Sequence, residues 1–116
     1  TSDERIKKDI TSMENRLDDL MNIKVRRFKM KKTGRERIGF IAQELVTHAP
    51  EAVVVGTDEV WSKEEAEDSQ TATEGELKNP WGISKELLIP MMVKSIQELS
   101  AKNDALEAKV KTLESA

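Results

Sequence analysis

The chain has no cysteine and no tyrosine, a single histidine, and only two phenylalanines and two tryptophans among its 116 residues. The absence of cysteine excludes disulfides and thiol catalysis, and it fits a reducing compartment. Because His48 is the only histidine, a multi-histidine metal site is excluded as well. No apolar run is long enough to span a bilayer, and no signal-peptide pattern is present. We therefore expect neither a metal nor another cofactor.

The charge balance and the low apolar content limit what the chain binds and how it folds. Its formal net charge is -3, which argues against nucleic acid or a membrane as the default partner. Hydrophobic residues make up 37% and charged residues 35% of a chain that is long enough for one domain at most. Part of the apolar content lies in a C-terminal heptad run, so the remaining core is small. Such a chain needs partner subunits to bury enough surface.

The first ten residues predict the start of a helix and also contain a candidate nucleophile. Ser2 and Asp3 are typical N-cap residues. The apolar positions that follow are spaced four, three, four and three, which predicts an amphipathic helix that ends near Asn22: Ile6, Ile10, Met13, Leu17 and Leu20. A serine followed closely by lysines also combines a nucleophile with a base. Taken by itself, Ser2 is better explained as a cap, because capping serines outnumber nucleophiles.

A basic hairpin is predicted next. Eight of the fourteen residues from 24 to 37 are Lys or Arg, and Phe28 and Met30 alternate with basic residues as in a half-buried strand. A turn at 32–34 leads into a second strand. We expect its basic face either to be solvated or to meet acidic residues elsewhere in an oligomer. Binding of nucleic acid by this face is the less favoured alternative. A short helix then follows Gly39 and must stop before Pro50.

An acidic segment separates two further predicted strands. Residues 51–56 contain three consecutive β-branched valines and end in Gly, and residues 81–83 are again mostly apolar, so each of the two segments is predicted to be a short strand. Residues 57–80 between them hold eight Asp or Glu and two Lys. We expect this segment to be a long acidic surface loop, mobile in part. Ser84 is a good N-cap for the helix that follows.

The C-terminal segment, residues 85–116, carries an unbroken heptad seam. The a positions are Ile89, Ile96, Asn103 and Val110, and the d positions are Met92, Leu99, Leu106 and Leu113. This strict spacing favours self-association through a coiled coil, with Pro90 either kinking the helix or marking its first turn. Asn103 at an a position fixes register and strand number at a cost in stability. The seam predicts an oligomer without deciding between two and three strands.

Four motifs occur in a definite order along the chain: Ser2-Asp3-x-Arg5-x-Lys7, Gly39-Phe40-Ile41-Ala42-Gln43-Glu44, Trp81-Gly82-Ile83-Ser84, and Leu88-Ile89-Pro90 leading through Ile96-Gln97-Glu98-Leu99. In this succession the chain resembles the intramolecular chaperone (peptidase S74) domains at the C-termini of phage tail fibres and tailspikes. The acidic insertion at 57–80 departs from the family pattern. The resemblance implies a homotrimer that folds and aligns three copies of an upstream β-rich fibre and then cuts itself off. It also implies action in the host cell cytoplasm during virion assembly, with the domain absent from, or only loosely held to, the mature virion.

The resemblance also implies a cleavage site and its chemistry. In the family the cut falls immediately before the serine, so the scissile bond would be Thr1-Ser2, with Ser2 and Lys7 as a catalytic dyad. The Ser2 hydroxyl would attack the Thr1 carbonyl through a five-membered ring, or Ser2 of a neighbouring subunit would attack it. Lys7 must lose its proton to act as a base, through desolvation or through nearby Arg5 and Lys8. Five residues on an ideal helix turn a side chain by about 140°, so Ser2 must lie ahead of the first turn or the lysine must come from another chain.

Four more residues are candidates for supporting this site. Asp3 and Arg5 either orient the dyad or pair with each other on the surface. Gln43 and Glu44 support the site or a trimer interface, and we favour a structural role for both.

The sequence thus predicts an α+β fold in a single domain, residues 1–116. It consists of a cleavage site and N-terminal helix (1–23), a small antiparallel sheet with a short helix and an acidic loop (24–84), and a long coiled-coil helix (85–116) in a homotrimer. The leading interpretation is a self-cleaving trimerisation chaperone, a single-turnover serine peptidase. The alternative is a structural coiled-coil cap that never cleaves, and Ser2 with Lys7 distinguishes the two.

Overall fold

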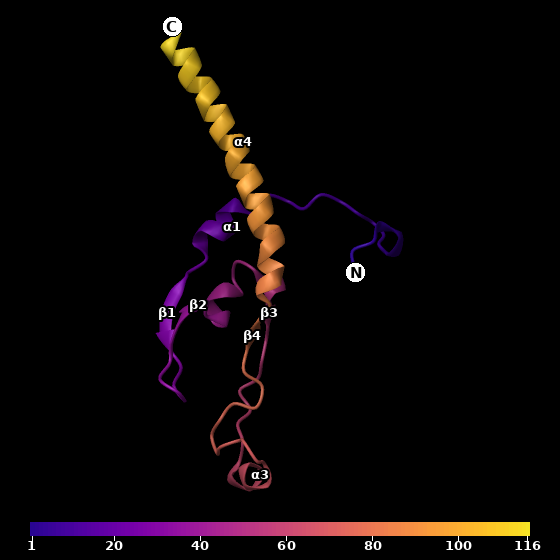
Figure 1. Ribbon diagram of the computed structural model, residues 1–116, viewed down its shortest axis with the longest axis vertical. Coiled ribbons are helices and arrows are strands. Elements are labelled where there is room, and N and C mark those ends of the chain that lie inside the picture. The colour runs from indigo at the N-terminus through magenta and orange to yellow at the C-terminus, as the bar shows by residue number, and fades with distance from the viewer.

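A computed structural model describes all 116 residues, and three parts of the chain project from a small central body (Figure 1). The molecule measures 77 × 40 × 20 Å and has a radius of gyration of 21.5 Å. A compact domain of this length would have a radius of gyration of about 13 Å. The elements in chain order are η1 (Glu4–Ile6), α1 (Leu17–Asn22), β1 (Arg26–Lys29), β2 (Glu36–Gly39), α2 (Ala42–Leu45), η2 (Pro50–Ala52), β3 (Val53–Val54), α3 (Lys63–Asp68), β4 (Gly82–Ile83), η3 (Lys85–Leu87) and α4 (Leu88–Glu114).

The predicted N-terminal helix is wrong over most of its length. Only the short 3-10 turn η1 and the six-residue helix α1 form, and residues 7–16 between them are irregular. Asp3, and not Ser2, caps η1 by accepting a hydrogen bond from the Arg5 backbone amide. Residues 1–12 are all exposed, so the apolar stripe at Ile6 and Ile10 has no surface to pack against. A helix this short gains most of its stability from such packing, and without it the helix does not form.

The predicted hairpin is confirmed. β1 and β2 pair antiparallel with Phe28 opposite Arg37, and the turn contains Gly34 with a φ of 70°. That left-handed conformation favours glycine, because a Cβ would be strained there. The Gly34 amide donates to the Met30 carbonyl at 2.7 Å and closes the turn.

The short helix after Gly39 is also confirmed. The two strands predicted on either side of the acidic segment are confirmed as well, although they are shorter than predicted. α2 ends at Leu45, before Pro50, which opens η2. β3 pairs antiparallel with β4 in a second two-stranded sheet. Beyond this sheet, Gly56 lies so close to the opposite chain that a Cβ would sit 2.0 Å from the Asn79 carbonyl oxygen. Only glycine fits at that crossing.

The acidic segment 57–80 is a protrusion whose chain is irregular for most of its length, as predicted, but it contains a helix that was not predicted. Its two legs join through an antiparallel bridge between Val60 and Leu77. Its tip is α3, which starts with a capping box in which Ser62 and Glu65 exchange side-chain and backbone hydrogen bonds. This Ser-x-x-Glu spacing is a local helix signal that the high acidic content obscured.

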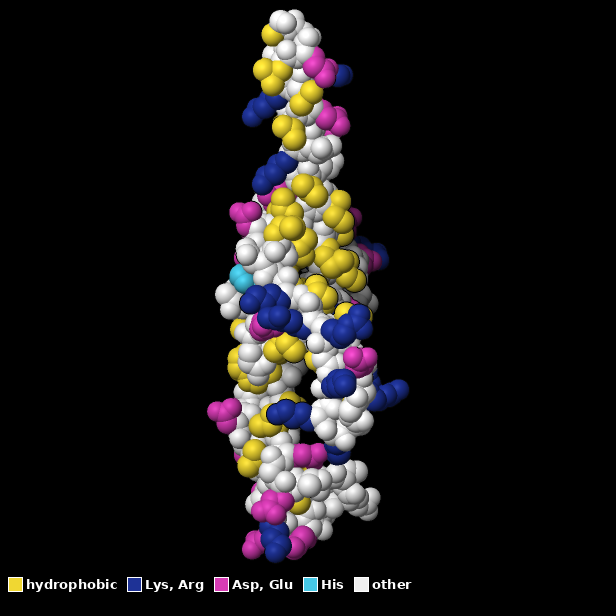
Figure 2. Space-filling view, turned by 90° about the vertical axis from the view of Figure 1, so that its left-hand side faces the viewer, with side chains coloured by type: hydrophobic (Ala, Val, Ile, Leu, Met, Phe, Trp, Pro, Cys, Tyr) yellow, Lys and Arg dark blue, Asp and Glu magenta, His cyan; other side chains and the backbone are white.

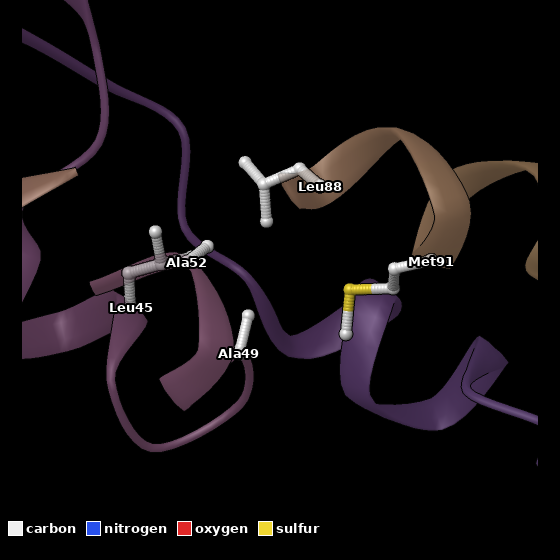
Figure 3. Close-up of a cluster of buried hydrophobic side chains, with 5 residues drawn as sticks. All are labelled: Leu45, Ala49, Ala52, Leu88 and Met91. Carbon is white, nitrogen blue, oxygen red and sulfur yellow. The ribbon is translucent and has the colours of Figure 1, made fainter. Parts of the chain in front are cut away.

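The core is small and lies between α2, η2 and the start of α4 (Figure 3). It consists of Leu45, Ala49, Ala52, Leu88 and Met91. Only seven of the 116 residues are buried. A core of this size agrees with the low apolar content of the chain and leaves most of α4 without cover.

α4 presents two different faces. The inner face packs on the chain's own body, and its residues are spaced three, four and three: Leu88, Met91, Ser95 and Glu98. The outer face is the heptad seam, which begins one residue later at Ile89. Large apolar side chains are usually covered, but the seven apolar residues of this seam are 43 to 75% exposed: Ile89, Met92, Ile96, Leu99, Leu106, Val110 and Leu113. The helix is thus continuous through the predicted seam, and Pro90 lies in its first turn.

Replacing Met91 with alanine tests the inner face. We expect Met91→Ala to lower the free energy of unfolding by about 2–5 kcal/mol, because it leaves a cavity in the core. Met21→Ala is the matched control, since Met21 is 73% exposed, and its effect should stay within about 0.5 kcal/mol. Urea unfolding followed by circular dichroism, at one protein concentration, measures both. Equal effects of the two substitutions would contradict the packing described here.

The protrusion should loosen in acid. A hydrogen bond from Lys78, followed by those with Ser62, lowers the pKa of Glu65 from 4.5 to about 2. The unfolded carboxyl therefore binds a proton at higher pH than the folded one, so this contribution to stability is present above about pH 4.5 and is lost as the pH falls toward 2. The protection factors of the α3 amides, which are corrected for the intrinsic pH dependence of hydrogen exchange, should fall over that range, and Glu65→Gln should remove this dependence. A Glu65 carboxyl that titrates near 4.5 by NMR would contradict the pairing with Lys78.

Candidate functional site

Ser2 and Lys7 lie on either side of η1, on the exposed N-terminal segment. Ser2 precedes the turn, which agrees with the first of the two alternatives derived from helix geometry, and Lys7 follows the turn with an extended backbone at φ −116° and ψ 151°. Both residues are exposed. Within one chain no hydrogen bond joins the Ser2 hydroxyl to the Lys7 amine. The dyad therefore stays a prediction.

Asp3 and Arg5 pair with each other. The Arg5 guanidinium donates to both Asp3 carboxylate oxygens, with Nη2 at 2.6 Å from Oδ2 and Nε at 3.0 Å from Oδ1. The hydrogen bond from Arg5 lowers the pKa of Asp3, and the same pairing raises the pKa of Arg5. Asp3 and Arg5 were predicted either to orient the dyad or to pair with each other on the surface. In the single chain they pair with each other.

Gln43 and Glu44 lie on α2, away from Ser2. Glu44 accepts two hydrogen bonds from Arg26, at 3.0 and 2.7 Å, and so ties α2 to the hairpin. This hydrogen bonding from Arg26 lowers the pKa of Glu44. Gln43 borders a hollow of about 400 Å³ whose lining includes Phe28 and Trp81. Figure 1 places η1 and α2 on opposite sides of the start of α4, so one chain does not bring these two residues to Ser2.

Arg16 anchors the base of the N-terminal segment to the body, a role that no sequence pattern predicted. Its guanidinium donates to the Asp19 carboxylate at 2.9 Å, to the Glu51 carboxylate at 3.0 Å and to the His48 carbonyl at 2.7 Å. Its side chain is 11% exposed. Burial lowers the pKa of Arg16, but the hydrogen bonds with Asp19 and Glu51 outweigh that effect and the net pKa is raised. His48, for which no partner was predicted, also lies 3.8 Å from Asp19 through Nδ1.

Glu98 anchors the same segment to α4. Its Oε1 accepts a hydrogen bond from the backbone amide of Leu17, the first residue of α1, at 3.2 Å. Its Oε2 lies 3.2 Å from the Lys102 amine, and the Glu98 side chain is 10% exposed. Leu17 and Glu98 are 81 residues apart, so no local pattern could have predicted the contact.

Hydrophobic side chains are exposed along α4 and where its lower half meets α1 (Figure 2). One hollow beside the seam is lined entirely by apolar residues, among them Phe40 of the body and Met92 of the seam, and has a volume of about 240 Å³. None of the helices has both the length and the apolar composition that crossing a membrane requires.

These features define a class of protein: an α+β chain with small antiparallel sheets and a long C-terminal helix that leaves one apolar face uncovered. The family model described as "Chaperone of endosialidase" (Peptidase_S74) matches residues 2–54. This match confirms, over these residues, the resemblance inferred from the order of the motifs. No curated protein matches the chain.

The matched region contains the Ser2–Lys7 motif and the segment from Gly39 to Glu44, and it ends before the protrusion and α4. The family description agrees with a chaperone role, and the family name suggests autoproteolytic peptidase activity. Neither assigns a catalytic role to Ser2 or Lys7.

Proposed function

We propose that the chain is a C-terminal intramolecular chaperone that trimerises, folds an upstream phage tail fibre or tailspike, and releases itself by autoproteolysis at Thr1-Ser2. The observation that carries this proposal is the uncovered seam of α4. Its apolar side chains recur with strict heptad spacing over the helix and have no partner within the chain. A row of such residues is stable in water when it packs against copies of itself.

The three copies would lie in parallel, so that each a position meets its equivalents. Asn103 donates to Glu107 of its own helix at 3.4 Å in the single chain. In a parallel trimer the three Asn103 side chains would instead meet near the axis, where amides fix the register. Alignment of the three C-terminal helices would align the three fibre chains that precede them.

Cleavage would follow assembly in the host cell cytoplasm. Lys7, acting as a neutral amine, takes the proton of the Ser2 hydroxyl while the oxygen attacks the carbonyl carbon of Thr1. The Thr1-Ser2 carbon–nitrogen bond then breaks, the proton passes to the freed Ser2 amine, and an ester joins Thr1 to the Ser2 oxygen. Water hydrolyses this ester and releases the fibre. Ser2 and Lys7 are exposed in one chain, which supports a site that neighbouring copies complete and desolvate.

The oligomeric state is tested by sedimentation equilibrium. The isolated chain should be a trimer at micromolar concentration, because a helix with this uncovered seam is poorly stable alone in water. Leu99→Asp combined with Leu106→Asp should abolish assembly, since the six charges that a trimer would bury have no partners. Ala108→Asp, on the helix face away from the seam, is the control and should leave the trimer intact. A monomeric or dimeric wild-type chain would refute the proposal.

The chemistry is tested in the full-length parent with Ser2→Ala, Lys7→Ala and Lys8→Ala, compared on native and denaturing gels. All three should assemble, because the seam is unchanged. Ser2→Ala should stay uncut since it has no nucleophile, and Lys7→Ala should stay uncut since a neutral hydroxyl attacks an amide far too slowly without a base. Lys8→Ala should cleave like the wild type, which separates a specific base from general positive charge. Efficient cleavage in either of the first two variants would favour the structural cap instead.

A further inference from the structure

The exposed N-terminal segment, residues 1–12, is called the arm here. It carries the proposed scissile bond and, as Figure 1 shows, runs away from the body on the side of α4 opposite the hairpin. All of its residues are exposed, and the first half-buried side chain after it is Met13. The direction of the arm is therefore decided where the chain rejoins the body, at residues 13–17.

Packing leaves much of that junction open. A hollow of about 440 Å³ lies between the junction and α4, and only two of its seven lining residues, Ala101 and Ala105, are hydrophobic. Asn15 borders it from the arm side and Glu98 from α4. Met13 packs against the core, but apolar contact does not fill this hollow, so polar contacts also set the position of the junction.

Two polar contacts hold the junction, and they lead to different parts of the molecule. Arg16 binds the body through the His48 carbonyl and the Glu51 carboxylate. The Leu17 amide binds Glu98, and this is the only hydrogen bond that joins α4 to a segment distant in sequence. A backbone amide at the start of a helix has no partner within that helix, so a nearly buried carboxylate oxygen is a favourable acceptor for it.

Glu98 also lies next to the assembly seam. It is on the inner face of α4, directly before the seam residue Leu99, so a helix held by its seam holds Glu98 with it. Covalent bonds and one hydrogen bond therefore connect the seam to the arm, in the order Leu99, Glu98, the Leu17 amide and the chain that leads back to Ser2.

We propose that Glu98 is a positioning residue for the cleavage reaction, and this inference rests on the proposed function. Assembly fixes α4, and Glu98 through the Leu17 amide fixes the direction in which the arm leaves the body. Ser2 is thereby held toward the place where the assembled copies complete its site. Glu98 touches no reacting atom, so its effect is on arm position and not on the chemistry of the dyad.

The test compares two substitutions in the full-length parent. Glu98→Gln keeps an acceptor oxygen, whereas Glu98→Met keeps the length and helix preference of the side chain without the acceptor. We expect the half-time of cleavage to rise at least tenfold in Glu98→Met and less than threefold in Glu98→Gln, with both proteins trimeric on native gels. Hydrogen exchange of the Leu17 amide, measured on the uncut Ser2→Ala background, should speed up in Glu98→Met alone.

Lys102→Ala is the matched control, because it removes the ion pair with Glu98 but leaves the bond to Leu17. It should cleave like the wild type. Wild-type rates in Glu98→Met, or equal slowing in Glu98→Gln and Glu98→Met, would overturn the positioning role while leaving the proposed function standing. Failure of Glu98→Met to form a trimer would overturn it too, since Glu98 would then act in assembly. A wild-type parent that never cleaves would instead refute the proposed function.

Discussion

The rest of the structure depends on the division of α4 into two faces. Met91 and its neighbours on the inner face are buried against α2 and η2, while the seam that begins at Ile89 lies about a quarter turn away and has no partner in the chain. One helix therefore serves both as part of a small core and as a free surface for association. With only seven buried residues, the body is too small to cover both faces, so the seam stays available.

The hydrogen bond that joins α4 to a distant part of the chain belongs to the inner face as well. Glu98 accepts a hydrogen bond from the first residue of α1. Arg16, the residue directly before α1, binds the loop that precedes η2. These two side chains are among the least exposed charged groups of the molecule. They link the assembly helix, the body and the arm at one junction, whereas the ion pair of Asp3 with Arg5 is local to the arm. The proposed order of events, cleavage after assembly, needs such a connection between α4 and the arm.

The sequence predicted the parts of the fold that local patterns control. Alternation of Phe28 with basic residues and a glycine turn specify the hairpin, Pro50 limits α2, and the heptad spacing specifies α4. The order of four motifs indicated the family whose model matches residues 2–54, a region that contains the first two of them. The helix at the tip of the acidic protrusion was predictable from Ser62 and Glu65 and was missed, because charge content outweighed a capping signal.

What the sequence by itself determined about this protein is thus its periodic elements, its resemblance to one family and the residue types available for chemistry. Only the tertiary structure decided that the N-terminal stripe does not form a helix, that α4 has an inner face interrupted by Ser95 and Glu98, and that Arg16 and Glu98 hold the arm. The physical reason is range. Propensity and periodicity act over a few residues, whereas the contacts of Arg16 and Glu98 join groups 32 to 81 residues apart, and the stripe of Ile6 and Ile10 can become helical only where another surface covers it.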